Sequence, residues 1–321
     1  MTILVTGGLG YIGSHISKIA DQKVIIIDNQ SNSLLDYKKI LPNAKVITED
    51  LNYENVCKIF KIYDIDSVIH LAGSKSVEES LEFPLNYYSN NVSSSIGLLR
   101  AMIEFNVNKL IFSSSATVYG NDNNSPLKEN FLTKYINPYG HSKIIIEEII
   151  ENCCASYSNF SAISLRYFNP IGAHSDGSLG DRPKGKPLNL MPLIVDSVFG
   201  KKLTVFGNDY PTADGTCLRD YIHIMDLAEA HLICLKNFNN IKYDVFNVGL
   251  GMGISVLDLI DTFEQVNRVK VNFRIGDRRQ GDAAISFADN SKFKKRFNWS
   301  PKYDYKIMCK DSWGHRNINQ E

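Results

Sequence analysis

The sequence lacks several features that would place the protein in a specialised class. It has no Cys-x-x-Cys pair and no Cys/His cluster at the spacing of metal ligands, so we expect no metal site. Its 35 basic and 35 acidic residues cancel, and no overall charge favours nucleic acid or an anionic membrane. No apolar run approaches the roughly 20 residues that span a bilayer, and no basic stretch leads into an apolar segment and cleavage site at the N-terminus. A small-molecule substrate fits this composition better.

The six cysteines form no evident disulfide framework. Cys153 and Cys154 are adjacent on a predicted helix, which suits buried thiols better than a routine disulfide. We therefore expect reduced thiols and a cytoplasmic protein.

The first half of the chain alternates short apolar runs with helical patterns, which is typical of a parallel sheet covered on both faces. It predicts an α/β fold with a Rossmann-type doubly wound sheet. After residue 170 loops rich in Gly, Asp and Pro follow. We expect residues 1–170 to form the sheet domain and residues 171–321 mainly a smaller C-terminal lobe, with some segments returning to the sheet. The expected strands of the first part span residues 3–6, 23–28, 44–48, 67–71, 109–113 and 161–166, and its two long helices residues 84–105 and 139–157.

A glycine-rich segment, residues 7–13, directly follows the first predicted strand and opens a helix. Gly7 permits the tight turn, Gly10 lets the backbone approach a pyrophosphate, and Gly13 allows close helix packing. Asp28, at the end of the second strand, can accept hydrogen bonds from an adenosine ribose. Its carboxylate would repel a 2'-phosphate, so the segment predicts NAD rather than NADP.

Tyr139 and Lys143 stand four residues apart, downstream of a serine run at residues 113–115. This spacing puts the phenol and the ammonium on one face of a helix, where the cation can favour the phenolate. Bringing a tyrosine pKa from about 10 to near 7 takes roughly 4 kcal/mol, which a lysine and a positively charged nicotinamide could share. His70 lies inside an apolar strand and is better explained as a core histidine than as a catalytic base.

Three further motifs are distinctive. Residues 86–92 read Asn-Tyr-Tyr-Ser-Asn-Asn-Val, residues 166–170 read Arg-Tyr-Phe-Asn-Pro, and residues 219–223 read Arg-Asp-Tyr-Ile-His. Together with the glycine segment and the serine, tyrosine and lysine, they resemble the extended short-chain dehydrogenase/reductases, and within them the UDP-glucose 4-epimerase family. The resemblance extends through nearly the whole chain.

The resemblance implies an NAD-dependent isomerase that inverts C4 of UDP-glucose and UDP-galactose through a transient 4-keto sugar. Tyr139 would remove the proton of the sugar 4-hydroxyl while hydride passes to NAD, Ser115 would hydrogen-bond the reacting oxygen, and Lys143 would lower the Tyr139 pKa. NAD would then be bound by residues 1–170 and the UDP-sugar mainly by residues 171–321. The expected NAD contacts are Gly7, Gly10, Tyr11, Ile12, Gly13, Asp28, Asn29, Asn32, Ser33, Asp50, Leu51, Leu71, Ala72, Gly73, Lys75, Asn90, Ser115, Tyr139, Lys143 and Phe168.

The substrate diphosphate needs donors beyond the cofactor site. Arg219 and Arg279 are the candidates, because a guanidinium binds phosphate oxygens in bidentate fashion. The resemblance assigns both to the UDP portion and suggests that Phe206 packs against the uracil. The expected substrate contacts are Lys75, Ser115, Thr117, Tyr139, Asn169, Asn189, Leu190, Phe206, Arg219, Arg279, Asp282 and Ser286.

The resemblance also bears on the choice of sugar. Four residues after Asp282, glucose-restricted relatives carry a tyrosine that narrows the sugar pocket, whereas relatives that accept N-acetylated sugars carry a small residue. This chain has Ser286 there, so we expect it to accept UDP-N-acetylglucosamine and UDP-N-acetylgalactosamine as well. The run Ala-Ala-Ile-Ser at residues 283–286 differs from the family's usual Leu-Pro-Ala-Tyr.

Three alternatives stay open. A nucleotide-sugar 4,6-dehydratase shares the fold, but it normally needs an Asp-Glu pair beside the active-site threonine, where this chain has Ala116-Thr117-Val118. A decarboxylating or 4-reductase relative is harder to exclude by motif, although a reductase would release its cofactor. A dinucleotide-sensing protein without catalysis would not need the tyrosine and lysine. By resemblance we also expect a homodimer that pairs through residues 84–105 and 135–157.

Overall fold

The computed structural model describes residues 1–33, 36–185, 187–279 and 281–318. The chain forms two compact units built from interleaved segments. The first unit contains residues 1–120, 132–166 and 228–246, and the second contains residues 121–131, 167–227 and 247–321.

The first unit is built on a seven-stranded sheet in the order β11-β6-β5-β4-β1-β2-β3. Strands β1 to β6 pair in parallel, and the chain order reverses direction at β1 and β4. The predicted doubly wound parallel sheet is therefore confirmed. Its strands are β1 (Thr2–Thr6), β2 (Lys23–Ile27), β3 (Lys45–Ile47), β4 (Ser67–His70), β5 (Lys109–Ser113), β6 (Ser161–Tyr167) and β11 (Tyr243–Val248).

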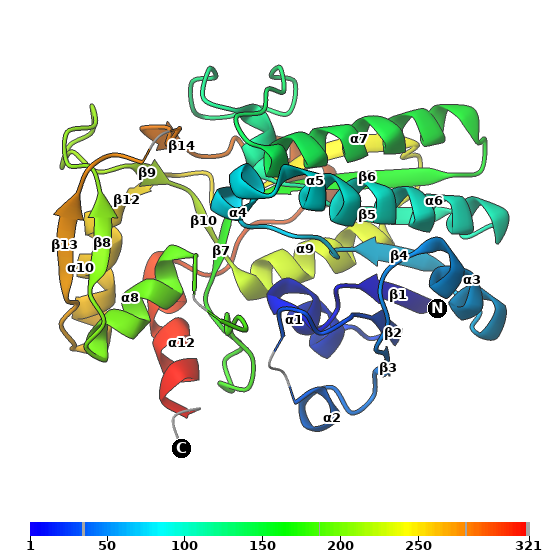
Figure 1. Ribbon diagram of the computed structural model, residues 1–321, viewed down its shortest axis with the longest axis horizontal. Coiled ribbons are helices and arrows are strands. Elements are labelled where there is room, and N and C mark those ends of the chain that lie inside the picture. Colours follow the sequence, from blue (N-terminus) through cyan, green and yellow to red (C-terminus); the bar gives the residue numbers. More distant parts are fainter. Residues whose placement is uncertain (34–35, 186, 280, 319–321) are drawn as a thin grey trace. The chain divides into compact units, whose positions relative to one another are not determined.

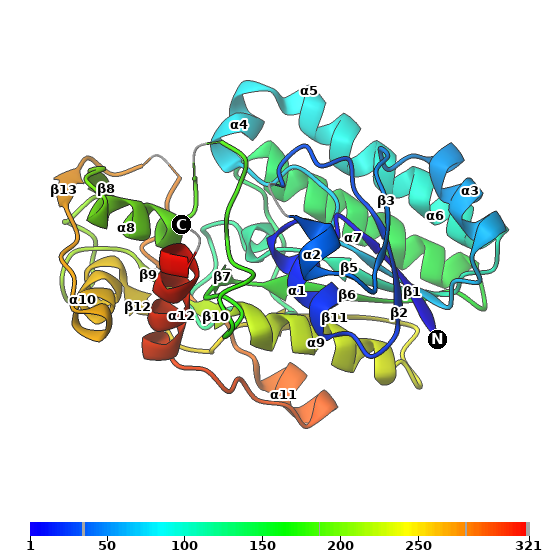
Figure 2. The same ribbon diagram turned by 90° about the horizontal axis from the view of Figure 1, so that it is seen from below.

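Helices cover both faces of this sheet, which is why its strands read as continuous apolar runs. Figures 1 and 2 show α3, α6 and α7 on one face and α1 and α9 on the other. On the first face, Leu4 of β1 packs in one core with Val56, Leu98 and Ile146 from the three helices. The helices are α1 (Tyr11–Ile19), α2 (Tyr37–Ile40), α3 (Tyr53–Ile62), α4 (Val77–Glu82), α6 (Ser94–Glu104), α7 (Pro138–Ser156) and α9 (Ile224–Lys236).

The helical segment expected over residues 84–105 contains a π turn. The segment starts as α5 (Pro84–Tyr87), widens into the π-helical turn η1 (Tyr88–Ser93) and continues as α6. The predicted helical segment is therefore confirmed to within one residue at its end, and the π turn inside it is a feature that apolar periodicity does not reveal.

The second unit consists of small sheets and helices around its own core. β8 (Leu203–Phe206) pairs in parallel with β13 (Phe273–Gly276), and Leu203 and Val205 pack with Phe263 and Met308 from two helices. The helices are α8 (Leu190–Val198), α10 (Val256–Asn267), α11 (Ser291–Phe297) and α12 (Tyr305–Ile318), and the remaining strands are β7 (Asn169–Ile171), β9 (Leu218–Arg219), β10 (Tyr221–His223), β12 (Ile254–Ser255) and β14 (Ile285–Ser286).

Within the described ranges, every helix is too short or too polar to cross a membrane. Cys57, Cys153, Cys154, Cys217 and Cys309 are free thiols.

Candidate active site

The turn after β1 needs glycine at two of the predicted positions. Gly7 has a φ of +68°, and a Cβ there would lie 2.8 Å from the backbone nitrogen of Ala72. A Cβ on Gly13 would lie 2.5 Å from the carbonyl oxygen of Gly7. Gly10 precedes α1 and provides no side-chain cap, so the first N–H groups of the helix are left for another acceptor. This cradle fits the pyrophosphate of a dinucleotide.

Asp28 fixes the edge of the same turn. Its Oδ2 accepts the Leu9 N–H at 3.0 Å and its Oδ1 accepts the Gln30 N–H at 2.7 Å. A carboxylate has about four lone-pair directions, so further acceptor capacity remains for ribose hydroxyls. The carboxylate thus supports the predicted preference for an unphosphorylated ribose.

The other expected adenosine contacts lie at the ends of β2 and β3 or in the first turn of α1. Asn29 Nδ2 donates to Asp50 Oδ1 at 2.8 Å, and Ser33 Oγ donates to the Leu9 carbonyl at 2.8 Å. Four further predicted contacts, Tyr11, Ile12, Asn32 and Leu51, are half-buried or exposed.

The segment after β4 is held by Thr6, which the sequence argument did not single out. Its Oγ1 accepts the N–H groups of Leu71 and Ala72, both at 3.2 Å. Gly73 follows with a φ of +154°. The three predicted contacts therefore form one turn at the carboxyl end of the sheet, where ligands bind in open α/β folds.

Asn91, buried in the π turn, anchors the next part of this segment. Its Oδ1 accepts the Ser74 N–H at 2.8 Å, and its Nδ2 donates to the Ser74 carbonyl at 3.0 Å and to Ser142 Oγ at 3.1 Å. The neighbouring Asn90 donates from Nδ2 to Ser74 Oγ at 2.9 Å, while Lys75 is exposed. The π turn thus joins the predicted NAD segment to helix α7.

Helix α7 carries Tyr139 and Lys143 in its first two turns. Asn137 caps the helix by accepting the Gly140 N–H at 2.8 Å, and Pro138 occupies the first turn. Tyr139 is 8% exposed and Lys143 5%. A firmly capped helix start therefore fixes both side chains in a largely dry environment.

Ser115 adjoins Tyr139 and starts the 3-10 turn η2 (Ala116–Tyr119). Its Oγ accepts hydrogen bonds from the backbone N–H of Thr117 at 3.3 Å and from Thr117 Oγ1 at 3.0 Å. Burial raises the pKa of Tyr139 above its ordinary value, and a hydrogen bond with Ser115 lowers it in part. The effect of burial exceeds that of the hydrogen bond, so the Tyr139 pKa of the polypeptide alone lies above the ordinary tyrosine value.

The Lys143 ammonium is anchored at the end of β5. Nζ donates to the Ser113 carbonyl at 2.8 Å and stands 4.9 Å from the centre of the Phe112 ring, against 5.9 Å for the Tyr139 ring. Burial lowers the pKa of Lys143 to about 8, and the charge of Glu147 opposes that change.

His70 is the core histidine that the sequence argument expected. It is 2% exposed, and its Nδ1 and Nε2 lie 2.7 Å from Thr6 Oγ1 and 2.8 Å from Ser95 Oγ. Burial, with a smaller effect of the Lys143 charge, lowers its pKa to about 3. A neutral, doubly hydrogen-bonded imidazole has no capacity left for a catalytic proton.

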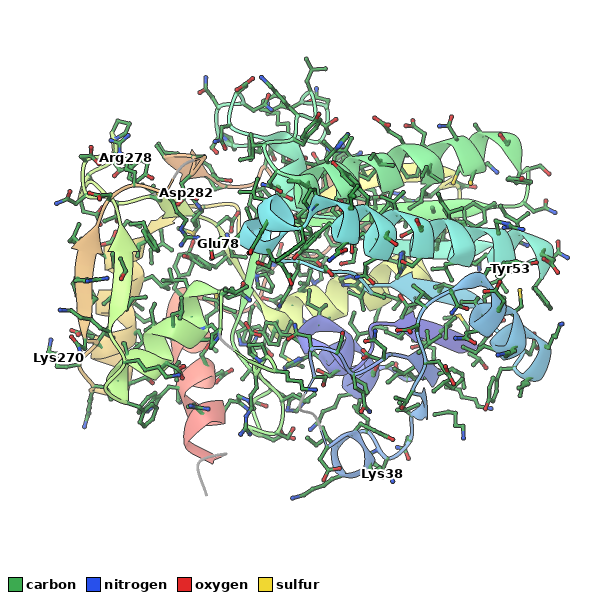
Figure 3. The ribbon with its side chains drawn as sticks, viewed as in Figure 1. Lys38, Tyr53, Glu78, Lys270, Arg278 and Asp282 are labelled. Carbon is green, nitrogen blue, oxygen red and sulfur yellow. The ribbon has the colours of Figure 1, made fainter. Side chains whose placement is uncertain are left out.

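The second unit carries the two predicted diphosphate ligands. Arg219 Nη1 donates to the Leu218 carbonyl at 2.9 Å, and Nη2 lies 3.7 Å from Asp282 Oδ1. The guanidinium of Arg279 stands 4.3 Å from the centre of the Phe206 ring. Asp282 lies on the segment that links β13 to β14 (Figure 3).

Ser286 is half-buried at the end of β14. It pairs in parallel with Arg219 of β9, and Ile285 pairs with Leu218. The end of the segment at residues 283–286, which differs from the family's usual sequence, is therefore paired with Arg219, a residue predicted to bind the diphosphate.

The remaining predicted contacts also belong to the second unit. Asn169 Nδ2 donates to the Asp220 carbonyl at 2.7 Å, and Asn189 Nδ2 donates to Asp181 Oδ2 at 2.8 Å at the start of α8. Leu190 is the first residue of that helix. Phe168 is buried. Among the described residues, no cluster of three or more His, Cys, Asp or Glu side chains is arranged to hold a metal ion.

Comparison with known proteins places the chain in a family. Residues 3–249 match the model of the NAD dependent epimerase/dehydratase family. The chain belongs to this family. The predicted family resemblance is thereby confirmed.

The similarity of this epimerase/dehydratase family member to individual proteins extends from end to end. It is 44% identical to the UDP-glucose 4-epimerase of Bacillus subtilis, over 99% of this chain and 98% of that protein. A crystal structure of UDP-glucose-4-epimerase from Stenotrophomonas maltophila, with bound NAD and formylated UDP-arabinopyranose, superposes with a TM-score of 0.95 at 40% identity, covering 100% of this chain and 99% of that one. The Bifidobacterium longum UDP-glucose 4-epimerase, in complex with NAD+ and UDP, gives a TM-score of 0.95 at 38% identity, with 99% of each chain covered.

Proposed function

We propose that this protein interconverts the C4 epimers of UDP-hexoses, UDP-glucose and UDP-galactose first among them, with NAD as a retained cofactor. The observation that carries the proposal is the buried group of Ser115, Tyr139 and Lys143 at the carboxyl end of β5 and the start of α7. It occurs in a chain similar over its whole length to UDP-glucose 4-epimerases.

NAD fits the first unit, because the glycine cradle and the Asp28 carboxylate meet the needs of its pyrophosphate and ribose. When bound, NAD accepts hydride from sugar C4 and returns it, so that no net oxidation occurs. We assign NAD to the first unit and the UDP portion mainly to the second, where Arg219 and Arg279 supply cations for the diphosphate.

The polypeptide's own part in the chemistry is proton transfer at the 4-hydroxyl. Tyr139 receives this proton when the ketone forms and gives it back when the alcohol reforms. Ser115 holds the same oxygen, and its hydrogen bond offsets part of the rise that burial causes in the Tyr139 pKa. Lys143, with a pKa of about 8, supplies a nearby positive charge that can favour the phenolate.

The test is an assay of purified protein with UDP-galactose and no added cofactor, in which the C4 epimers are resolved by chromatography. Epimers in this assay support both the reaction and retained NAD. Tyr139→Phe should lower kcat by about 100-fold or more, the usual contribution of a general base, with KM little changed. If neither epimer forms even after NAD is supplied, the proposal is wrong. A one-way consumption of NADH would instead indicate a reductase.

We also propose that the small Ser286 side chain admits N-acetylated sugars. Ser286→Tyr should abolish turnover of UDP-N-acetylgalactosamine while UDP-galactose turnover stays within a few-fold, because a phenol would fill space beside Arg219. Ser286→Ala, which keeps a small side chain at the same position, is the matched control and should leave turnover of both substrates within a few-fold. Equal loss of both substrates would show that Ser286 does not select the sugar.

We further propose a homodimer in the cytoplasm. Ile96 of α6 is 41% exposed, whereas Leu99 is 3% exposed and belongs to the core. Ile145 and Ile149 of α7 are half-buried. Sedimentation equilibrium should give the mass of two chains, and Ile96→Arg should shift it toward one chain, while Ile62→Arg, another exposed apolar position, should not.

A further inference from the structure

We infer that Glu147, held by Arg166, is a positioning residue that keeps Lys143 charged and thereby sets the alkaline limit of the reaction. This inference rests on the proposed function and adds to it two residues for which the sequence argument gave no role in the chemistry.

The two side chains form a buried bidentate ion pair between α7 and β6. Arg166 Nε donates to Glu147 Oε1 at 3.0 Å and Oε2 at 3.2 Å, and Nη2 donates to Oε2 at 2.5 Å. The side chains are only 7% and 6% exposed. Apolar residues of similar size often join two elements equally well, since a buried ion pair is costly to desolvate. A charge at this position therefore points to a role beyond packing.

Glu147 lies four residues after Lys143, so the two share one face of α7. Lys143 needs such a neighbour, because burial lowers its pKa to about 8. The negative charge of Glu147 opposes this change and raises the Lys143 pKa. Without Glu147, more of the Lys143 population would be neutral near pH 8 and could not supply a positive charge to Tyr139.

Arg166 connects the pair to the other side of the site. Its guanidinium stands 5.0 Å from the centre of the Tyr119 ring in η2, the turn that Ser115 starts. Burial alone would lower the Arg166 pKa, but Glu147 and, to a smaller extent, Tyr119 raise it above its ordinary value, so the guanidinium is cationic at every working pH. One ion pair thus links the helix of Tyr139 and Lys143 to the turn of Ser115.

Other groups also contribute to the local field and remain unchanged in the test below. Lys143 faces the Ser113 carbonyl and Phe112 from β5, and its charge acts on His70 of β4. Burial and the charge of Glu147 raise the pKa of Tyr243 in β11, whereas the charge of Arg166 lowers it. Glu151 of α7 has a smaller effect on the same pKa. Besides Glu147, Arg166 and Lys143 themselves, the titratable groups around the ion pair and the Lys143 ammonium are Tyr119, Tyr139, Glu151, His70 and Tyr243.

The experiment compares the pH profile of kcat for four proteins with UDP-galactose: wild type, Glu147→Gln, Arg166→Met and Glu147→Asp. Removing the carboxylate should move the alkaline limb to lower pH by about one unit, as expected for loss of one close charge. At about pH 8.5 this corresponds to a roughly eightfold loss in kcat, with little change near pH 6.

Arg166→Met is the matched control, because it breaks the same ion pair and keeps the negative charge beside Lys143. It should lower the melting temperature at least as much as Glu147→Gln without moving the alkaline limb to lower pH. Glu147→Asp should restore most of the wild-type profile. If Arg166→Met fails to fold, Arg166→Gln takes its place, because it also breaks the ion pair and keeps the Glu147 charge. If Glu147→Gln fails to fold, the double variant Glu147→Gln/Arg166→Met, which buries no lone charge, should still show the alkaline limb at lower pH.

The inference is overturned if Glu147→Gln keeps the wild-type limb, or if it and Arg166→Met move the limb equally. Both outcomes would mean that the pair only holds α7 to β6. Failure of the proposed function is a separate result, because in that case wild-type protein forms no epimer at any pH.

Discussion

His70 should make the folded protein sensitive to mild acid. Its pKa is lowered from 6.5 to about 3 in the folded state. Between these two values His70 is protonated in the unfolded chain and neutral in the folded one. The stability from neutral His70 is fully present above pH 6.5 and is lost as the pH falls toward 3. The loss is about 1.4 kcal/mol per pH unit, or roughly 2 kcal/mol between pH 6.5 and about 5.

Urea unfolding of wild type and His70→Asn, followed by circular dichroism from about pH 7.5 to about pH 5, measures this effect. Other titrating groups are common to both proteins, so the difference in unfolding free energy isolates His70. Wild type should be more stable at pH 7.5, because His70→Asn disturbs the contacts to Thr6 and Ser95, and its advantage should shrink with acid at the stated slope. A pH-independent difference would refute the assignment of a buried neutral imidazole.

Two further predictions concern the ligands. Gly13→Ala should reduce the amount of NAD that copurifies with the protein and destabilise the fold by about 1–3 kcal/mol, because the new Cβ would lie 2.5 Å from the Gly7 carbonyl oxygen. Gly314→Ala is the control and should have neither effect, since a Cβ there meets no neighbour within 4 Å. Equal NAD content in both variants would contradict the assignment of the glycine cradle to NAD. Arg219→Lys should raise KM for UDP-galactose about tenfold and change kcat less, since an ammonium cannot bind two phosphate oxygens in a fork. Steady-state kinetics measure both constants, and Arg100→Lys, at a residue with no assigned ligand contact, is the control for a non-specific effect.

The sheet could be predicted from the sequence because each of its strands is a short apolar run between helical patterns. The strand at residues 109–113 coincides with β5, and the others differ from the structure by one or two residues at their ends. The chemistry-bearing side chains could be placed for a similar reason. Tyr139 and Lys143 follow a capped helix start, and the glycines of residues 7–13 follow a strand, so local geometry alone fixes them.

The supporting contacts could not be predicted in the same way, because they join residues distant in the sequence. Thr6 holds Leu71, and Arg166 pairs with Glu147, through packing that no local pattern encodes. The Tyr139 pKa shows the same limit. Helical spacing places Lys143 near Tyr139, but the rise in the Tyr139 pKa that burial causes depends on the whole fold and cannot be read from spacing.

The π turn η1 has a consequence for how this protein can tolerate insertions and deletions. Removing one residue from Tyr88–Ser93 would let the segment close into a regular α-helix, which is locally the easier conformation. It would also rotate everything before the deletion by about 100° relative to α6. Asn90 and Asn91 would then lose Ser74 and Ser142. The length of this short stretch is therefore under tighter constraint than its exposed, polar composition suggests.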